Sequence, residues 1–161
     1  MRVVLVPPFP ASLMVLQFLD RYRDLGLLLL RVGIGCSIAF AHGWGKLTGG
    51  VDTWVQYGQT LDALLGIGFL PAFWGFMAAV AEFFGGLLVA CGLLFRPALA
   101  LLVINMAVAA GVHATGVIEG SPWHAIDLGI VFLALVLIGP GRYSFDERFS
   151  ATHTARRAPR F

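Results

Sequence analysis

Four long apolar segments are the feature that most constrains how this chain can fold. They lie at residues 25–47, 72–94, 98–116 and 124–140. Each reaches the roughly 17 to 25 residues that a helix needs to cross the hydrocarbon core of a bilayer, the fourth only just. Such segments cross as helices, because a helix pairs its own backbone N–H and C=O groups where no water is present. The sequence therefore predicts an all-α polytopic membrane protein.

The composition agrees with this prediction. Only 12% of the 161 residues are charged, whereas a soluble domain has roughly 25%. Hydrophobic residues make up 58% of the chain, and the mean hydropathy is +0.84. A single domain over residues 1–161, built as a four-transmembrane-helix bundle, accounts for the length.

Basic residues are distributed unevenly about the four segments. Nine of the eleven precede the first segment, separate the second from the third, or follow the fourth, and a four-span topology places all nine on one side. The positive-inside rule then predicts a protein of the cell membrane with both termini in the cytoplasm, including the tail 141–161. The lipid bilayer is the expected partner of this basic tail, and no nucleic-acid partner is predicted.

Two further segments have helical patterns of their own. The connection 48–71 has apolar and aromatic residues at helical spacing, which predicts an amphipathic helix at the outer interface between the first two spans. Residues 11–26 are expected to form a second interfacial helix that leads into the first span. Cys36 and Cys91 differ in predicted depth by roughly 10 Å, too far for a disulfide.

Charged residues inside the spans are candidates for function, since each costs roughly 2.5 to 3.5 kcal/mol to insert. Arg31 and Glu82 are two of them, and small residues on the same helical faces would let the two helices approach closely. One interpretation is a buried polar pair between Arg31 and Glu82. The other gives Glu82 a role in handling a proton or a substrate.

A second group of polar residues lies near the outer ends of the spans. Arg31, Gly35, His42 and Lys46 fall within roughly 60° of one another on a helical wheel. His113, His124 and Asp127 have the same predicted depth as His42 and Lys46.

These outer residues predict a pocket beneath the segment 48–71. The residues expected to bind a cofactor there are His42, Lys46, His113 and Asp127. Alternatively, Lys46 extends to the interface and the histidines simply meet water. Haem ligation by His42 and His113 is a weaker interpretation, and no metal site is predicted.

Three stretches carry a resemblance to a known family. They are LLLRVGIG…AHGWGKL (28–47), AEFFGGLLVACGLLFRPALALLVINMAVA (81–109) and IGPGRYSFD (138–146). In these stretches the chain resembles the DoxX family of small membrane proteins, in the wider group that includes the DoxD subunit of thiosulfate:quinone oxidoreductase. The resemblance implies a four-helix bundle, with the family's characteristic Arg, Lys and Glu at Arg31, Lys46 and Glu82. It also implies an association with oxidoreductases in thiol, sulfur or quinone metabolism.

Three functional hypotheses follow. The leading one is an integral membrane subunit of a redox-associated complex, which binds quinone or a similar lipophilic molecule for a partner oxidoreductase. The chain shows no evident electron carrier, so whether it is an enzyme is left open. The second is a small proton or solute transporter, which would need a homo-oligomer because four helices leave little room for a pore. The third is a structural or docking protein without chemistry, with GRYSFDERFS as its recruiting segment.

Overall fold

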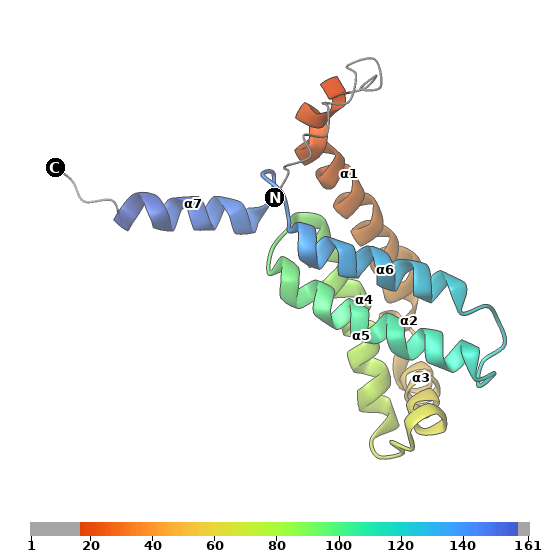
Figure 1. Ribbon diagram of the computed structural model, residues 1–161. Coiled ribbons are helices and arrows are strands. Elements are labelled where there is room, and N and C mark those ends of the chain that lie inside the picture. Colours follow the sequence, from red (N-terminus) through yellow and green to blue (C-terminus); the bar gives the residue numbers. More distant parts are fainter. Residues whose placement is uncertain (1–16, 158–161) are drawn as a thin grey trace, which may run out of the picture.

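A computed structural model describes residues 17–157, and every regular element in that part of the chain is helical. A nearly continuous helical rod comes first, and separate helices follow it (Figure 1). The elements are η2 (Gln17–Tyr22), α1 (Arg23–Cys36), the π-helix η3 (Ser37–Gly43), α2 (Trp44–Thr48), α3 (Gly50–Leu65), α4 (Pro71–Cys91), α5 (Phe95–Ala114), α6 (Trp123–Ile138) and α7 (Phe145–Arg157). The prediction of an all-α fold is confirmed.

Three helices in the described residues are long and apolar enough to cross a membrane: Phe18–Thr48, Pro71–Cys91 and Phe95–Ala114. Their ends lie within a few residues of the predicted spans, apart from an earlier start of the first. The apolar helix α6 has 16 residues, just below the usual spanning length. A fourth crossing therefore stays a prediction.

The two predicted interfacial helices are observed as helices to different extents. The connection 48–71 does contain a helix, α3, but its position at a membrane interface stays a prediction. Gly66, in the left-handed conformation at φ 71°, ends α3, and Pro71 occupies the first turn of α4, where its missing N–H costs nothing. Residues 11–16 lie outside the described part, and from Gln17 onward the chain is helical and continues directly into α1.

Helix α4 is the centre of the bundle. It packs against α1, η3, α2, α3 and α5, while α6 packs mainly against α5. The buried apolar core lies among η3, α4, α5 and α6; its residues are Ile38, Val89, Phe95, Ala98, Leu99, Leu102, Met106, Ala125, Phe132 and Leu135. Helix α7 projects away from the bundle (Figure 1).

Small residues let α4 approach its neighbours at backbone distance. A Cβ atom added to Gly86 would lie 2.6 Å from the carbonyl oxygen of Gly35 in α1. A Cβ atom at Gly75 would overlap the carbonyl oxygen of Trp54 in α3, and one at Gly58 of α3 would overlap that of Pro71. Because these obstacles are backbone atoms, no rotamer change could relieve the overlap. The α1–α4 contact and the α3–α4 contact therefore both depend on glycine, as close helix packing in membranes commonly does.

We expect Gly75→Ala to reduce the free energy of unfolding by about 2 kcal/mol, the middle of the range for overpacked sites. The matched control is Gly45→Ala in α2, where a Cβ atom would meet nothing within 4 Å. The control should be neutral or slightly stabilising, since alanine favours a helix. Chemical denaturation in detergent checks both variants, and equal effects would contradict the proposed close approach of α3 and α4.

Candidate ligand-binding site

The carboxylate of Glu82 is the centre of a buried polar cluster. Glu82 lies on α4 and is only 2% exposed. Its Oε1 atom accepts two hydrogen bonds, from Lys46 Nζ at 2.6 Å and from Asn105 Nδ2 at 2.7 Å. Lys46 comes from α2 and Asn105 from α5, so the cluster joins three segments of the bundle.

Lys46 is held in place by its surroundings on α3. Its ammonium nitrogen lies 4.8 Å from the centre of the Tyr57 ring, within the range of a cation–π interaction. Its backbone carbonyl accepts a hydrogen bond from the indole N–H of Trp54 at 2.9 Å. These contacts orient the ammonium group toward Glu82, although the lysine side chain remains 22% exposed.

The polar cluster lies at the wall of a cavity of about 440 Å³ between α3, α4 and α5. This volume is in the range of small-molecule sites, which are typically apolar with a few convergent polar groups. The lining residues are Lys46, Tyr57, Thr60, Leu61, Leu65, Trp74, Met77, Ala78, Ala81, Glu82, Leu101, Ile104, Asn105, Val108, Ala109, Val112, His113 and Ile118. We call this space the α3–α5 cavity.

Two polar atoms on residues lining the α3–α5 cavity have no hydrogen-bond partner within the described residues. They are Glu82 Oε2 and the indole Nε1 of Trp74, and both are buried. Buried polar atoms are nearly always hydrogen-bonded, because an unmade bond costs about 1 to 3 kcal/mol. One atom is an acceptor and the other a donor, so the residues that line the cavity carry both kinds of unmet bond.

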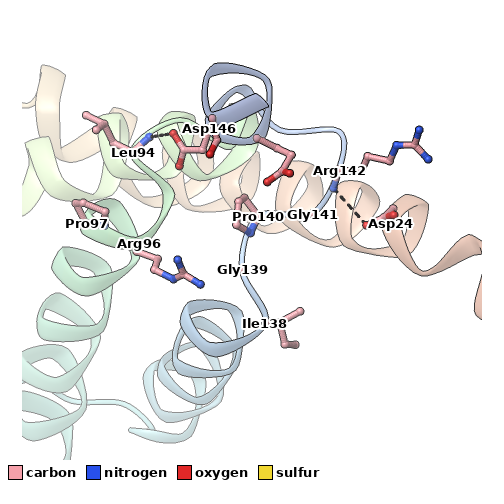
Figure 2. Close-up of a pocket in the computed structure, with 12 residues that line it drawn as sticks. Asp24, Leu94, Arg96, Pro97, Ile138, Gly139, Pro140, Gly141, Arg142 and Asp146 are labelled. Atoms are coloured by element: carbon pink, nitrogen blue, oxygen red, sulfur yellow. Dashed lines mark hydrogen bonds between the residues drawn. The ribbon is translucent and has the colours of Figure 1, made fainter. Parts of the chain in front are cut away.

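Arg31 belongs to a different polar cluster, which joins three distant parts of the chain. Its guanidinium donates to the carbonyl oxygens of Pro140, at 2.8 Å, and Tyr143. Nearby, both oxygens of Asp146 accept from the backbone at the start of α5, from Leu94 N and Phe95 N at 2.9 Å each. Figure 2 shows the carboxylate of Asp146 directed at Leu94. We call Arg31, the α4–α5 turn and residues 139–146 the clasp.

The family comparison covers most of these features. The DoxX family model matches residues 26–115, which is more than half of the chain. The chain belongs to the DoxX family. Its match runs from α1 to the end of α5 and so includes the whole Lys46–Glu82–Asn105 cluster, while α6, α7 and the second half of the clasp lie outside it. No curated protein and no solved structure shows a significant match.

The predicted pairing of Arg31 with Glu82 is wrong for this DoxX protein. Both side chains are 2% exposed, as a buried pair requires, but they bind different partners. Lys46 takes the place that the prediction gave to Arg31, and the two terminal nitrogens of the arginine donate to carbonyl groups of the clasp. The sequence could not indicate this, because Pro140 and Tyr143 follow Arg31 by more than 100 residues.

The four predicted cofactor-binding residues separate into two groups in the DoxX fold. Lys46 and His113 line the α3–α5 cavity, whereas His42 and Asp127 do not. Instead, the half-buried ring of His42 stacks on that of His124, with ring centres 5.4 Å apart, and Asp127 is exposed on α6. The sequence prediction left Asn105, Tyr57 and Trp74 out of the site. Tyr57 lies in the helix predicted within 48–71, and Trp74 lies at the start of the second predicted span. The polar atoms of these two aromatic side chains were the sequence feature that could have assigned them to the site.

A second, more open cavity of about 760 Å³ lies beside the clasp and is drawn in Figure 2. It is lined by Asp24, Leu94, Arg96, Pro97, Ile138, Gly139, Pro140, Gly141, Arg142, Asp146, Glu147 and Ser150. Two of its three carboxylates already serve the fold: Asp146 caps α5, and Asp24 accepts from Arg142 N at 3.2 Å. Among the described residues, the side chains with unpaired buried atoms all lie outside its lining. The α3–α5 cavity is therefore the better candidate for a ligand of this DoxX protein.

Proposed function

We propose that this DoxX membrane protein binds a quinone or a similar lipophilic molecule in the α3–α5 cavity and presents it to a partner oxidoreductase. The observation that carries the proposal is an apolar cavity with a buried carboxylate, ammonium and amide cluster in its wall. A quinone needs this combination: an apolar slot for its ring and hydrogen-bonding groups for its oxygens.

Access from the lipid supports a lipophilic ligand. Leu65, Met77, Leu101 and Ile104 line the cavity and are also exposed on the outside of the bundle. In a membrane these side chains would face acyl chains, so a hydrophobic molecule could enter without passing through water. The proposed orientation, with both termini in the cytoplasm, would put the cavity toward the opposite leaflet.

The projecting helix α7 supports the second half of the proposal, a protein partner. This helix is polar, has Asp146 and Glu147 in its first turn, and extends away from the bundle (Figure 1). The clasp fixes where it starts, because Ser144 Oγ accepts from Glu147 N at 3.2 Å and Asp146 binds α5. A polar helix that is held at its start and projects from the bundle is suited to docking a soluble oxidoreductase.

We expect Ala109→Phe to reduce the quinone that copurifies with the protein at least about fivefold, because the ring would occupy the cavity. The matched control is Ala107→Phe on the same helix, where Ala107 is exposed and outside the cavity lining. Extraction and chromatographic quantification of quinone from detergent-purified, monodisperse protein measures both.

His42→Ala and Asp127→Asn are further controls and should retain bound quinone, because neither residue lines the cavity. Ala81→Phe fills the same cavity from α4, in case Ala109→Phe impairs folding. Unchanged quinone content in both folded cavity-filling variants would contradict the proposed site.

A further inference from the structure

The hydrogen bonds at Glu82 constrain the polar group of the ligand, in addition to the lipophilicity that the cavity requires. Lys46 and Asn105 both donate to Oε1, and Oε2 is left as a buried acceptor without a partner in the described residues. A carboxylate paired with an ammonium group is ionised, and an ionised carboxylate can only accept hydrogen bonds. A ligand group that approaches Oε2 must therefore bring a hydrogen-bond donor.

From this geometry we infer that the site selects a ligand carrying an O–H group, and so binds the reduced, quinol form of its ligand more tightly than the oxidised quinone. This inference rests on the proposed function and names the chemical form that the same site prefers. A quinone carbonyl oxygen can only accept, so beside Oε2 it would place two acceptors together and leave the carboxylate unpaired.

Lys46 can donate to either form of the ligand, so the difference between the forms comes from Glu82. The ammonium group of Lys46 has three hydrogens, and Glu82 Oε1 uses one of them. A hydroxyl group beside the pair can donate to Glu82 Oε2 and accept from Lys46 Nζ at the same time. A carbonyl group can make only the second of these bonds. Hydroxyl ligands therefore gain one charge-assisted hydrogen bond over carbonyl ligands of the same shape.

Trp74 contributes at a different place in the cavity. Its indole lies eight residues before Glu82 on α4, roughly 12 Å along the helix, so one ring bound at Glu82 does not reach both groups. The unpaired N–H of Trp74 would instead meet an acceptor elsewhere on the ligand. The selection between reduced and oxidised forms depends on Glu82 alone.

Three probes of nearly the same shape test the inference: a short-tailed benzoquinol kept anaerobic, the corresponding benzoquinone, and the dimethyl ether of the quinol. Binding is measured by equilibrium partitioning with the full-length protein in lipid nanodiscs, after subtraction of binding to empty nanodiscs. We expect the quinol to bind about tenfold more tightly, or better, than either other probe, the value of one hydrogen bond to a charged group. Equal binding of all three, or tighter binding of the quinone, would overturn the inference while leaving the proposed function in place. Binding of none of them would overturn both.

Glu82→Gln is the matched variant and should abolish the preference for the quinol, because a hydroxyl and a carbonyl oxygen can both accept from an amide NH₂ group. Lys46 and Asn105 would hold the glutamine carbonyl oxygen at the Oε1 position, which places its NH₂ group where Oε2 was. The site would then offer a donor, and the benzoquinone should bind about as tightly as the quinol. A folded Glu82→Gln protein that still prefers the quinol would contradict the role given to Oε2. The comparison of probes on the wild-type protein stands even if this variant does not fold.

Discussion

Lys46→Met is expected to reduce the free energy of unfolding by about 3 kcal/mol, and the double variant Lys46→Met/Glu82→Leu to recover most of that loss. The single change leaves the carboxylate of Glu82, which is 2% exposed, with Asn105 as its remaining partner. Removing one partner of a buried pair typically costs about 3 to 5 kcal/mol. We take the lower end because the Lys46 side chain is 22% exposed. Replacing both partners removes the uncompensated charge, so the stability should return.

The informative control is a second double variant, Arg31→Met/Glu82→Leu. Arg31 and Glu82 share no hydrogen-bond partner, so the effects of the two single changes should simply add. Denaturant titration in detergent gives the free energies for both double-mutant cycles. Recovery of stability in the Arg31 double variant, together with additive losses in the Lys46 double variant, would support the predicted Arg31–Glu82 pair and contradict the observed cluster.

Arg31→Met should be comparably damaging by itself, with a loss of about 3 kcal/mol. Methionine fills a similar volume, but the carbonyl oxygens of Pro140 and Tyr143 would lose their donor in a buried place. Each unsatisfied buried group costs about 1 to 3 kcal/mol. The change should also loosen residues 139–146, which amide hydrogen exchange would detect as faster exchange at the start of α7.

Arg142→Met is the matched control for this prediction. Arg142 belongs to the same connection, but it is exposed, and the bond that it makes to Asp24 uses its backbone N–H. Its replacement should therefore change the free energy of unfolding by less than about 0.5 kcal/mol. If the two arginine variants were equally stable, the clasp would contribute nothing to the fold.

Hydropathy predicted the helices well, because an apolar segment in lipid must pair its own backbone N–H and C=O groups and a helix does so. Three long apolar helices, the helix within 48–71 and the membership of Lys46 and His113 in one cavity all follow from apolar runs and residue spacing. Burial of Arg31 and Glu82 followed from the same reasoning. Which of the buried charges meet could not be predicted in this way, because pairing depends on how helices far apart in sequence are packed.

The π-helix η3 explains the error at His42. The wheel that placed His42 on one stripe with Arg31 and Lys46 assumed an unbroken α-helix, whereas Ser37–Gly43 has π geometry with i→i+5 hydrogen bonds. A π segment turns less per residue than an α-helix, so the faces before and after it do not follow the predicted register. His42 lies within that segment and stacks on His124, while Lys46, beyond it, faces Glu82. Nothing in the composition of SIAFAHG distinguishes it from an ordinary apolar helix.

The bonds of Arg31 also bear on how the protein is made. Its two carbonyl acceptors follow it by 109 and 112 residues, so the ribosome has added more than 100 residues after Arg31 before either exists. Until then neither acceptor is available to the guanidinium of Arg31. The Arg31 cluster can therefore close only when residues 140–143 are present: a nascent chain stopped before residue 140 lacks both of these acceptors.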